Sequence, residues 1–170
     1  MKIVEKPLIT GHLIIKVIDG KSGNELWRVD KPNLVVNGTK AVLTRLLNYT
    51  NPEQNQLWAI GAGDSNTSPS VTDTDLQGTK TVKKKYDSRT IDESAGYIEL
   101  EMVLGTGEGN VLATGEYFEE AGLFTRGDLD DPEAPGLTGE TMMCRQLHAP
   151  IHKDNTISLE YTWRLQVAIS

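Results

Sequence analysis

The residues best suited to metal chemistry lie near the C-terminal end of the sequence, where one cysteine and two histidines are spaced four residues apart. Cys144, His148 and His152 carry the sulfur and nitrogen atoms that zinc prefers, and on an α-helix this spacing would place all three on one face. Pro150 stands between the two histidines, and proline disfavours helix at its own position and at the residue before it. The sequence therefore predicts a buried strand cysteine and two turn histidines, not a metal site.

A second group of possible ligands is acidic and lies between residues 127 and 139. Carboxylate oxygens are what calcium prefers, but these residues lack the regular spacing and central glycine of an EF-hand loop. We expect a solvated surface loop that binds no calcium, and the pair Asp73 and Asp75 is interpreted in the same way. The acidic residues of the segment are Asp128, Asp130, Asp131 and Glu133.

The sequence contains no recognisable catalytic motif. The glycine-rich segments 61–63 and 105–109 do not lead into a helix with the spacing of a phosphate-binding loop. The serines lack a nucleophile-elbow sequence, and no histidine has an evident nucleophile partner. We therefore expect a protein that is not an enzyme, with no catalytic, cofactor-binding or metal-binding residues.

Composition narrows the set of partners. The formal net charge is −7, with 24 acidic and 17 basic residues, whereas nucleic-acid binding needs clustered Lys and Arg. The basic run 83–85 is short, and we expect it on the wet face of a strand, where it blunts a sheet edge. With one cysteine, no signal peptide and no apolar run of membrane-spanning length, the chain is predicted to be made in a cytoplasm and to bind neither nucleic acid nor membrane.

The final segment, 156–170, gives the clearest structural signal. Apolar residues such as Leu159, Tyr161, Trp163 and Leu165 alternate with polar ones, as in a strand with one buried and one wet face. A strand of this length needs neighbours along most of its length, so the fold must be rich in β-structure.

The rest of the chain supports one β-rich domain. Further strands are predicted at 12–19, 25–29, 34–36, 57–62, 79–86, 97–104, 115–125 and 142–148, with breaks at 30–33 and 149–155 and a bulge in 115–125. A short helix over about 39–48 follows capping residues at 37–39. The predicted fold is mainly β: an antiparallel β-sandwich or jelly-roll-like barrel with one short α-helix. Residues 1–11 form an N-terminal arm and residues 12–170 a single domain.

A series of short motifs follows a fixed order between Asn33 and Ile169. They include Asn33-Leu-Val-Val-Asn37-Gly38, Ile60-Gly-Ala-Gly63-Asp64, Thr72-Asp73-Thr74-Asp75-Leu76, Glu120-Ala121-Gly122-Leu123-Phe124, Met142-Met143-Cys144-Arg145 and Thr162-Trp163-Arg164-Leu165. Together they resemble a group of tailed-bacteriophage virion structural proteins, found as small proteins and as the first domain of tail-fibre-like chains. The hairpin at 12–29 and the acidic segment 127–139 depart from that pattern. The arginine expected after Leu76 is at best Arg89, which is displaced.

The resemblance implies a virion protein made in the bacterial host cytoplasm, most simply a capsid decoration (cement) protein that binds the major capsid protein. Tail or baseplate proteins are the partners of the alternative, a fibre-attachment adaptor. A homo-oligomer is expected, and a trimer would suit local threefold positions.

The N-terminal arm is the predicted partner-binding segment, because its apolar residues could lie over a neighbouring subunit. These residues are Ile3, Val4, Leu8 and Ile9. Deleting residues 2–10 is expected to leave the fold intact and to lower occupancy on particles. A third interpretation is a carbohydrate-binding module in which Trp27, Trp58 or Tyr49 stacks on a sugar.

Overall fold

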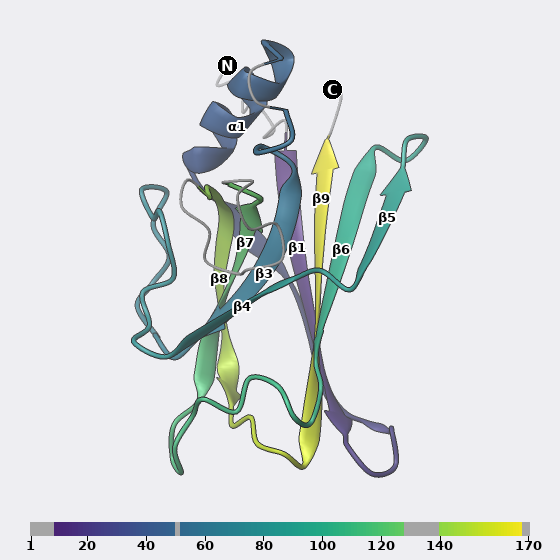
Figure 1. The fold of residues 1–170 in the computed structure, drawn as a ribbon, viewed down its shortest axis with the longest axis vertical. Coiled ribbons are helices and arrows are strands. Elements are labelled where there is room, and N and C mark those ends of the chain that lie inside the picture. The colour runs from purple at the N-terminus through teal and green to yellow at the C-terminus, as the bar shows by residue number, and fades with distance from the viewer. Residues whose placement is uncertain (1–8, 50–51, 128–139, 168–170) are drawn as a thin grey trace, which may run out of the picture.

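The computed structural model describes residues 9–49, 52–127 and 140–167, which form nine strands and one helix (Figure 1). The elements are β1 (Ile9–Asp19), β2 (Glu25–Val35), α1 (Gly38–Leu47), β3 (Leu57–Gly63), β4 (Thr81–Lys85), β5 (Ser88–Asp92), β6 (Tyr97–Leu104), β7 (Phe118–Thr125), β8 (Met142–Ile151) and β9 (Ile157–Val167). The predicted mainly β fold with one short helix is confirmed.

The strands form one curled antiparallel sheet in the order β4-β3-β7-β8-β2-β1-β9-β6-β5. One layer is β2-β1-β9-β6-β5 and the other is β4-β3-β7-β8. The layers join where Leu34 and Val35 at the end of β2 pair with β8. At the opposite edges the chain passes directly from β4 into β5, where the Asp87 amide donates to the Glu101 carbonyl at 2.7 Å. The sheet therefore curls into a sandwich-like barrel.

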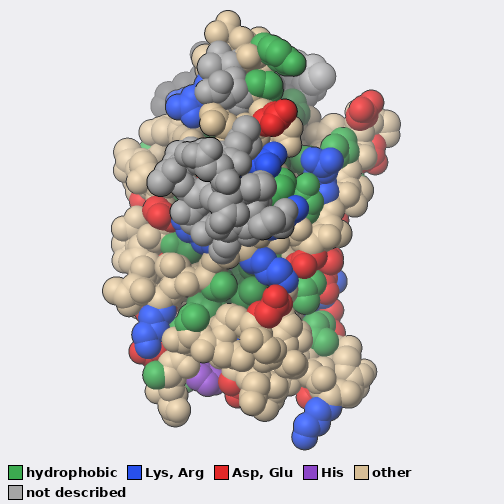
Figure 2. Space-filling model, viewed as in Figure 1, with side chains coloured by type: hydrophobic (Ala, Val, Ile, Leu, Met, Phe, Trp, Pro, Cys, Tyr) green, Lys and Arg blue, Asp and Glu red, His purple; other side chains and the backbone are tan. Residues whose placement is uncertain are grey.

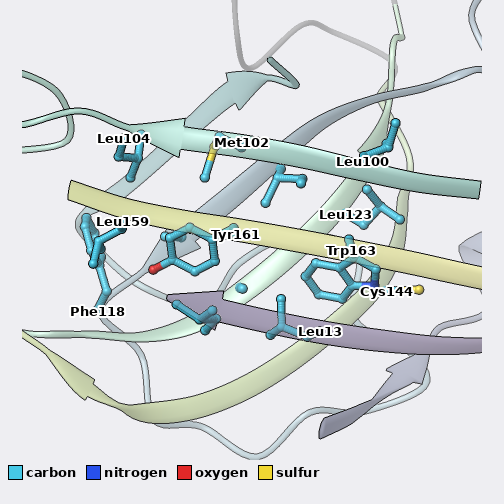
Figure 3. Close-up of a cluster of buried hydrophobic side chains, with 14 of the residues drawn as sticks. Leu13, Leu100, Met102, Leu104, Phe118, Leu123, Cys144, Leu159, Tyr161 and Trp163 are labelled. Atoms are coloured by element: carbon cyan, nitrogen blue, oxygen red, sulfur yellow. The ribbon is translucent and has the colours of Figure 1, made fainter. Parts of the chain in front are cut away.

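The core is organised around β9, as its alternation predicts. Tyr161 and Trp163 are fully buried, and Trp163 lies in register with Leu13 on β1 and Leu100 on β6. Figure 3 shows these side chains gathered with residues of β7 and β8, which belong to the other layer. Each large apolar side chain buried in this way stabilises the fold by about 1.5–3 kcal/mol.

β1 and β2 are longer than the sequence predicts. β1 starts at Ile9, so residues 9–11 of the expected arm pair with β9 instead. The break expected at 30–33 is wrong, because β2 continues through Pro32. The Pro32 carbonyl accepts from the Gln146 side chain on β8, so this peptide faces away from β1. The missing proline N–H therefore removes no bond of the β1–β2 ladder.

β8 also continues through a proline to Ile151, so the turn expected at 149–155 begins only at residue 152. Between the pairs Glu120↔Leu147 and Phe118↔Ile151 the register shifts, so Pro150 lies in a bulge of the β7–β8 ladder. Bulges leave backbone groups unpaired, and proline is tolerated there. The bulge expected within 115–125 is wrong, because at this shift and at a second one after Leu123 the extra residues lie in β8 and not in β7. β5 was not predicted, since its sequence SRTID has no clear alternation.

Helix α1 lies over one side of the barrel end at which β1 begins and β9 ends (Figure 1). The expected capping by Asn37 is wrong: its backbone is already helical and its side chain makes no cap hydrogen bond. Instead the Thr39 hydroxyl donates to the Met143 carbonyl at 2.7 Å, and Val42 enters the core. Leu46 and Leu47 remain 38% and 90% exposed, so only part of the apolar face of the helix is buried.

Candidate functional site

A buried ion-pair network, here called the loop latch, joins Arg145 of β8 to Glu120 of β7 and to Asp73 in the loop between β3 and β4. The Arg145 Nε donates to Glu120 Oε2 at 2.7 Å and its Nη1 donates to Asp73 Oδ2 at 2.8 Å. The Arg145 and Glu120 side chains are fully buried, and the Asp73 side chain is 13% exposed. The third guanidinium nitrogen donates to the Thr67 carbonyl at 2.9 Å, so every nitrogen of the group is used.

The latch fixes the backbone of the long loop 64–80. Glu120 accepts from the Gln77 and Gly78 amides at 3.2 and 2.7 Å, and Asp73 accepts from the Ser70 amide at 2.8 Å. Charge-assisted hydrogen bonds of this kind are about twice as strong as neutral ones. Because both carboxylates bind loop amides while they pair with Arg145, the loop is held against β7 and β8.

The loop covers an apolar patch on the outer face of β3 and β7. Leu76 packs there against Phe124, next to Ala59 and Met142. Gly61 and Gly122 are paired in register beneath Leu76, and a Cβ atom on either would lie within about 3 Å of neighbouring side chains. The two glycines therefore provide the space into which the loop settles.

This packing predicts that Gly122→Ala destabilises the protein by about 1–2 kcal/mol. A methyl group at Gly122 would lie 2.9 Å from the Phe124 ring and 3.1 Å from Leu76, so both must shift. Overpacking costs about 1–3 kcal/mol, partly offset by about 0.4–1 kcal/mol of lost unfolded-state entropy. Urea unfolding measures the change. The control is Gly107→Ala, where a Cβ meets no atom within 4 Å; an equal loss in both variants would contradict the packing argument.

A second ion cluster surrounds Lys83 on the edge strand β4. Its Nζ lies 2.8 Å from Asp75, pairs with Glu140, and sits 4.1 Å above the Phe124 ring. Burial raises the pKa of Glu140, although Lys83 opposes the shift. The prediction that the lysine run marks a sheet edge is confirmed. The prediction of a wet face is wrong for Lys83, whose side chain is only 11% exposed.

The predicted metal-ligand candidates are kept apart by the strand. Cys144 lies in the core, where burial raises the pKa of its thiol to about 12. His148 is buried against Tyr161, and His152 lies beyond β8 with its Nδ1 2.8 Å from the Glu116 carbonyl. Among the described residues no three His, Cys, Asp or Glu side chains converge to hold a metal ion.

The structure places the two acidic segments differently. Residues 128–133 lie outside the described residues, so the interpretation as a calcium-free loop stays a prediction. Asp73 was expected in a solvated loop, and this is wrong, because it belongs to the loop latch. Asp75 is exposed, and its carboxylate pairs with Lys83.

An apolar groove, here called the end groove, opens between α1 and the β5–β6 hairpin. It encloses about 420 Å³, and its walls include Ile9, Val42, Leu46, Ile91, Ile98 and Val167. The inner face of the sheet forms one wall: Ile91, Ile98 and Leu165 are neighbours in register, and exposure rises from 6% at Leu165 to 56% at Ile91. Figure 2 shows hydrophobic side chains exposed between the helix and the hairpin, beside Lys and Arg side chains.

The predicted arm residues are only partly described. Ile3, Val4 and Leu8 lie outside the described residues, and their role stays a prediction. Ile9 pairs with Val167, packs on the core and lines the end groove. The expected arm therefore meets the described fold at the wall of the groove.

The aromatic residues proposed for sugar stacking do not form a platform. Trp58 meets Tyr86 edge-on at 76°, and its ring is contacted by Lys85 at 4.3 Å and by Arg126 at 4.7 Å. Trp27 and Tyr49 are exposed, 37% and 82% respectively. A sugar-binding platform needs an accessible aromatic face, and the cations lie over that of Trp58.

Sequence reasoning missed the latch and the groove as sites. A signal for the latch existed in the sequence: Arg145 stands in the apolar run of β8 and Glu120 in the apolar run of β7. Because buried charges need a partner, these two opposite charges could have been predicted to pair. Within the described ranges no helix is long and apolar enough to cross a membrane. Comparison with protein-family models, with curated proteins and with solved structures finds no match to the chain.

Proposed function

We propose that this chain is a non-enzymatic structural protein of a tailed-bacteriophage virion, most simply a decoration protein that binds the outer head surface and stabilises subunit joints. The observation that carries the proposal is that motifs of the resemblance meet in space. Asp73, Glu120 and Arg145 come from three separate motifs and form one buried network. These residues hold a loop in place and do not form a reaction centre, as expected of a structural protein that acts through contacts of its surface.

The end groove supplies a surface for protein contact. Exposed apolar patches on soluble proteins mark interaction sites. In the end groove the apolar side chains of Ile91 and Leu46 are exposed to solvent. A modest interface on one copy is multiplied when many copies bind one lattice. The alternative function, an adaptor for tail, baseplate or fibre attachment, uses the same groove on a different partner. Carbohydrate binding is not proposed, because cations contact the ring of Trp58.

The test is negative-stain electron microscopy of gold-labelled protein mixed with stripped heads and with isolated tails. Regular labelling of the head lattice is the expected result. Labelling confined to the tail would replace decoration with the adaptor function, and labelling of neither particle would overturn the virion proposal.

A charged residue placed in the end groove is expected to weaken binding to particles in the same assay. Ile91→Asp is expected to lower particle occupancy at least tenfold, because it places a carboxylate on the apolar wall, and tenfold corresponds to about 1.4 kcal/mol. Ile91 is 56% exposed, so the fold should tolerate the change. The control is Val111→Asp, which alters another exposed β-branched residue (45% exposed) in the connection after β6, away from the groove. Equal occupancy of the two variants would contradict a role for the groove.

The arm deletion must be shortened in the light of the fold. Ile9 and Thr10 pair with Val167 and Gln166, so removing them would delete the first two pairs of the β1–β9 ladder. A deletion of residues 2–8 leaves every described strand intact and is the appropriate variant for the particle assay.

A further inference from the structure

We propose that the end groove binds residues 1–8 of a second copy of this chain, so that neighbouring copies exchange N-terminal segments. The inference rests on the proposed function and deepens it, because it specifies how the copies are joined. It starts from the groove itself, whose volume of about 420 Å³ is in the range of natural ligand sites, about 300–1,000 Å³. Such a large apolar space at the end of a core is suited to aliphatic side chains.

The chain supplies these side chains at the right place. Ile9 is part of the groove wall, and the eight residues before it include Ile3, Val4 and Leu8. Fully extended, eight residues span at most about 28 Å. The segment is therefore long enough to project well beyond its own molecule, toward an adjacent copy.

The direction of β1 favours a second copy over the same molecule. β1 runs from the groove end into the sandwich, paired with β9 from its first described residue. A segment that continues this direction backward leads away from its own groove. Pro7 disfavours helical geometry at Lys6, so an extended path is expected just before Leu8. To enter its own groove the chain must reverse within these residues, which leaves few of them for contact.

Charge is complementary between the segment and the groove. Lys2 and Lys6 against Glu5 give the side chains of the segment a formal charge of +1. The charged residues of the groove wall are Arg89, Asp92 and Glu93, with a formal sum of −1. Hydrogen bonds from Ser94 and the Ala95 amide lower the pKa of Asp92, so its carboxylate is ionised at neutral pH. Opposite charges at the rim of an apolar groove help to orient an incoming segment.

Cysteine cross-linking between two different variants tests the exchange. Ile3→Cys and a mass-tagged Ile91→Cys chain are co-expressed, purified and oxidised, and the products are separated by non-reducing electrophoresis. A disulfide between a tagged and an untagged chain forms only between copies. The native Cys144 is fully buried and does not compete. We expect a reducible band at the summed mass of one untagged chain of 18.7 kDa and one tagged chain, at least fivefold stronger than with Val111→Cys in place of Ile91→Cys.

The remaining outcomes are decisive against the proposal. If the double variant Ile3→Cys/Ile91→Cys gives only a faster-migrating monomer, the segment fills its own groove. If the mixed band is no stronger than the Val111→Cys control, residues 1–8 of another copy do not occupy the groove. Neither result depends on phage particles, so failure of the exchange and failure of the virion proposal are distinguished.

Discussion

Arg145→Met is expected to lower the free energy of unfolding by about 3–5 kcal/mol, because it leaves the fully buried Glu120 carboxylate without its cation. Methionine fills much of the arginine volume, so the loss reports charge and hydrogen bonding more than a cavity. Domains of this size are stable by about 5–15 kcal/mol. The variant is therefore expected to unfold at markedly lower urea concentration, or to fail to accumulate at 37 °C.

The matched control is Arg164→Met on the outer face of β9. Arg164 also pairs with a glutamate, since its Nη2 lies 2.7 Å from Glu99, but its side chain is 42% exposed. Water screens such a pair, and the expected loss is below about 1 kcal/mol. If both variants lose the same stability, burial is not what makes Arg145 important.

The double variant Arg145→Met/Glu120→Gln separates the pair from its surroundings. Glutamine removes the buried charge and can still accept from the Gly78 amide, which now bonds to Glu120 at 2.7 Å. It should recover part of the stability, and a coupling of about 0.5–3 kcal/mol is the range for residues in one network. Hydrogen exchange at the Gln77 and Gly78 amides should rise in Arg145→Met more than exchange in β9. Uniform acceleration across the sheet would contradict a local latch.

The strands were predictable where one face is buried and the other is wet. β9 and β6 meet this condition, because every second residue must avoid water, and α1 repeats its apolar residues at helical spacing. The prediction failed where proline was interpreted as a break, at Pro32 and Pro150. Both prolines occupy positions where the sheet needs no backbone N–H donor. Which positions these are depends on the partner strands, and for Pro32 the contacting strand β8 lies more than a hundred residues away in the sequence. β5 carries no pattern because Arg89 and Ile91 are both exposed.

The sites depend on contacts that no local pattern records. Asp73 and Arg145 are 72 residues apart in the sequence and meet only because the loop after β3 folds over β7 and β8. The order of the motifs indicated a resemblance to a family of proteins, but it assigned no role to these residues. The end groove is assembled from α1, the start of β1, the end of β9 and the β5–β6 hairpin. Its existence therefore follows from where one sheet layer ends, which is a property of the fold.

Acid is expected to destabilise the protein through His148, by about 2 kcal/mol at pH 5 and about 3 kcal/mol below pH 4. Burial lowers the pKa of His148 to about 4, from an ordinary value of 6.5. The Ala149 carbonyl lies 2.8 Å from Nδ1, so Nδ1–H is the donor of the neutral ring. Nε2 is buried with no hydrogen-bond partner among the described residues, and a proton added there would carry a charge into the core beside Tyr161. That charge has no solvent to stabilise it.

The sign follows from proton binding in the two states. Between pH 6.5 and 4 the unfolded chain protonates His148 while the folded chain does not, so unfolding takes up a proton and stability falls as pH falls. The total is the pKa difference of about 2.5 units, at 1.36 kcal/mol per unit.

Urea unfolding of wild type and His148→Asn at pH 7.5, 6 and 5 measures this linkage. Asparagine keeps a donor for the Ala149 carbonyl but cannot titrate. Its stability deficit relative to wild type should therefore shrink by about 2 kcal/mol between pH 7.5 and 5. Ile151→Val, at another buried position of β8, should cost about 0.5–1.5 kcal/mol equally at every pH. A deficit for His148→Asn that is as constant as that of Ile151→Val would mean that the buried imidazole accepts its proton without opposing the fold.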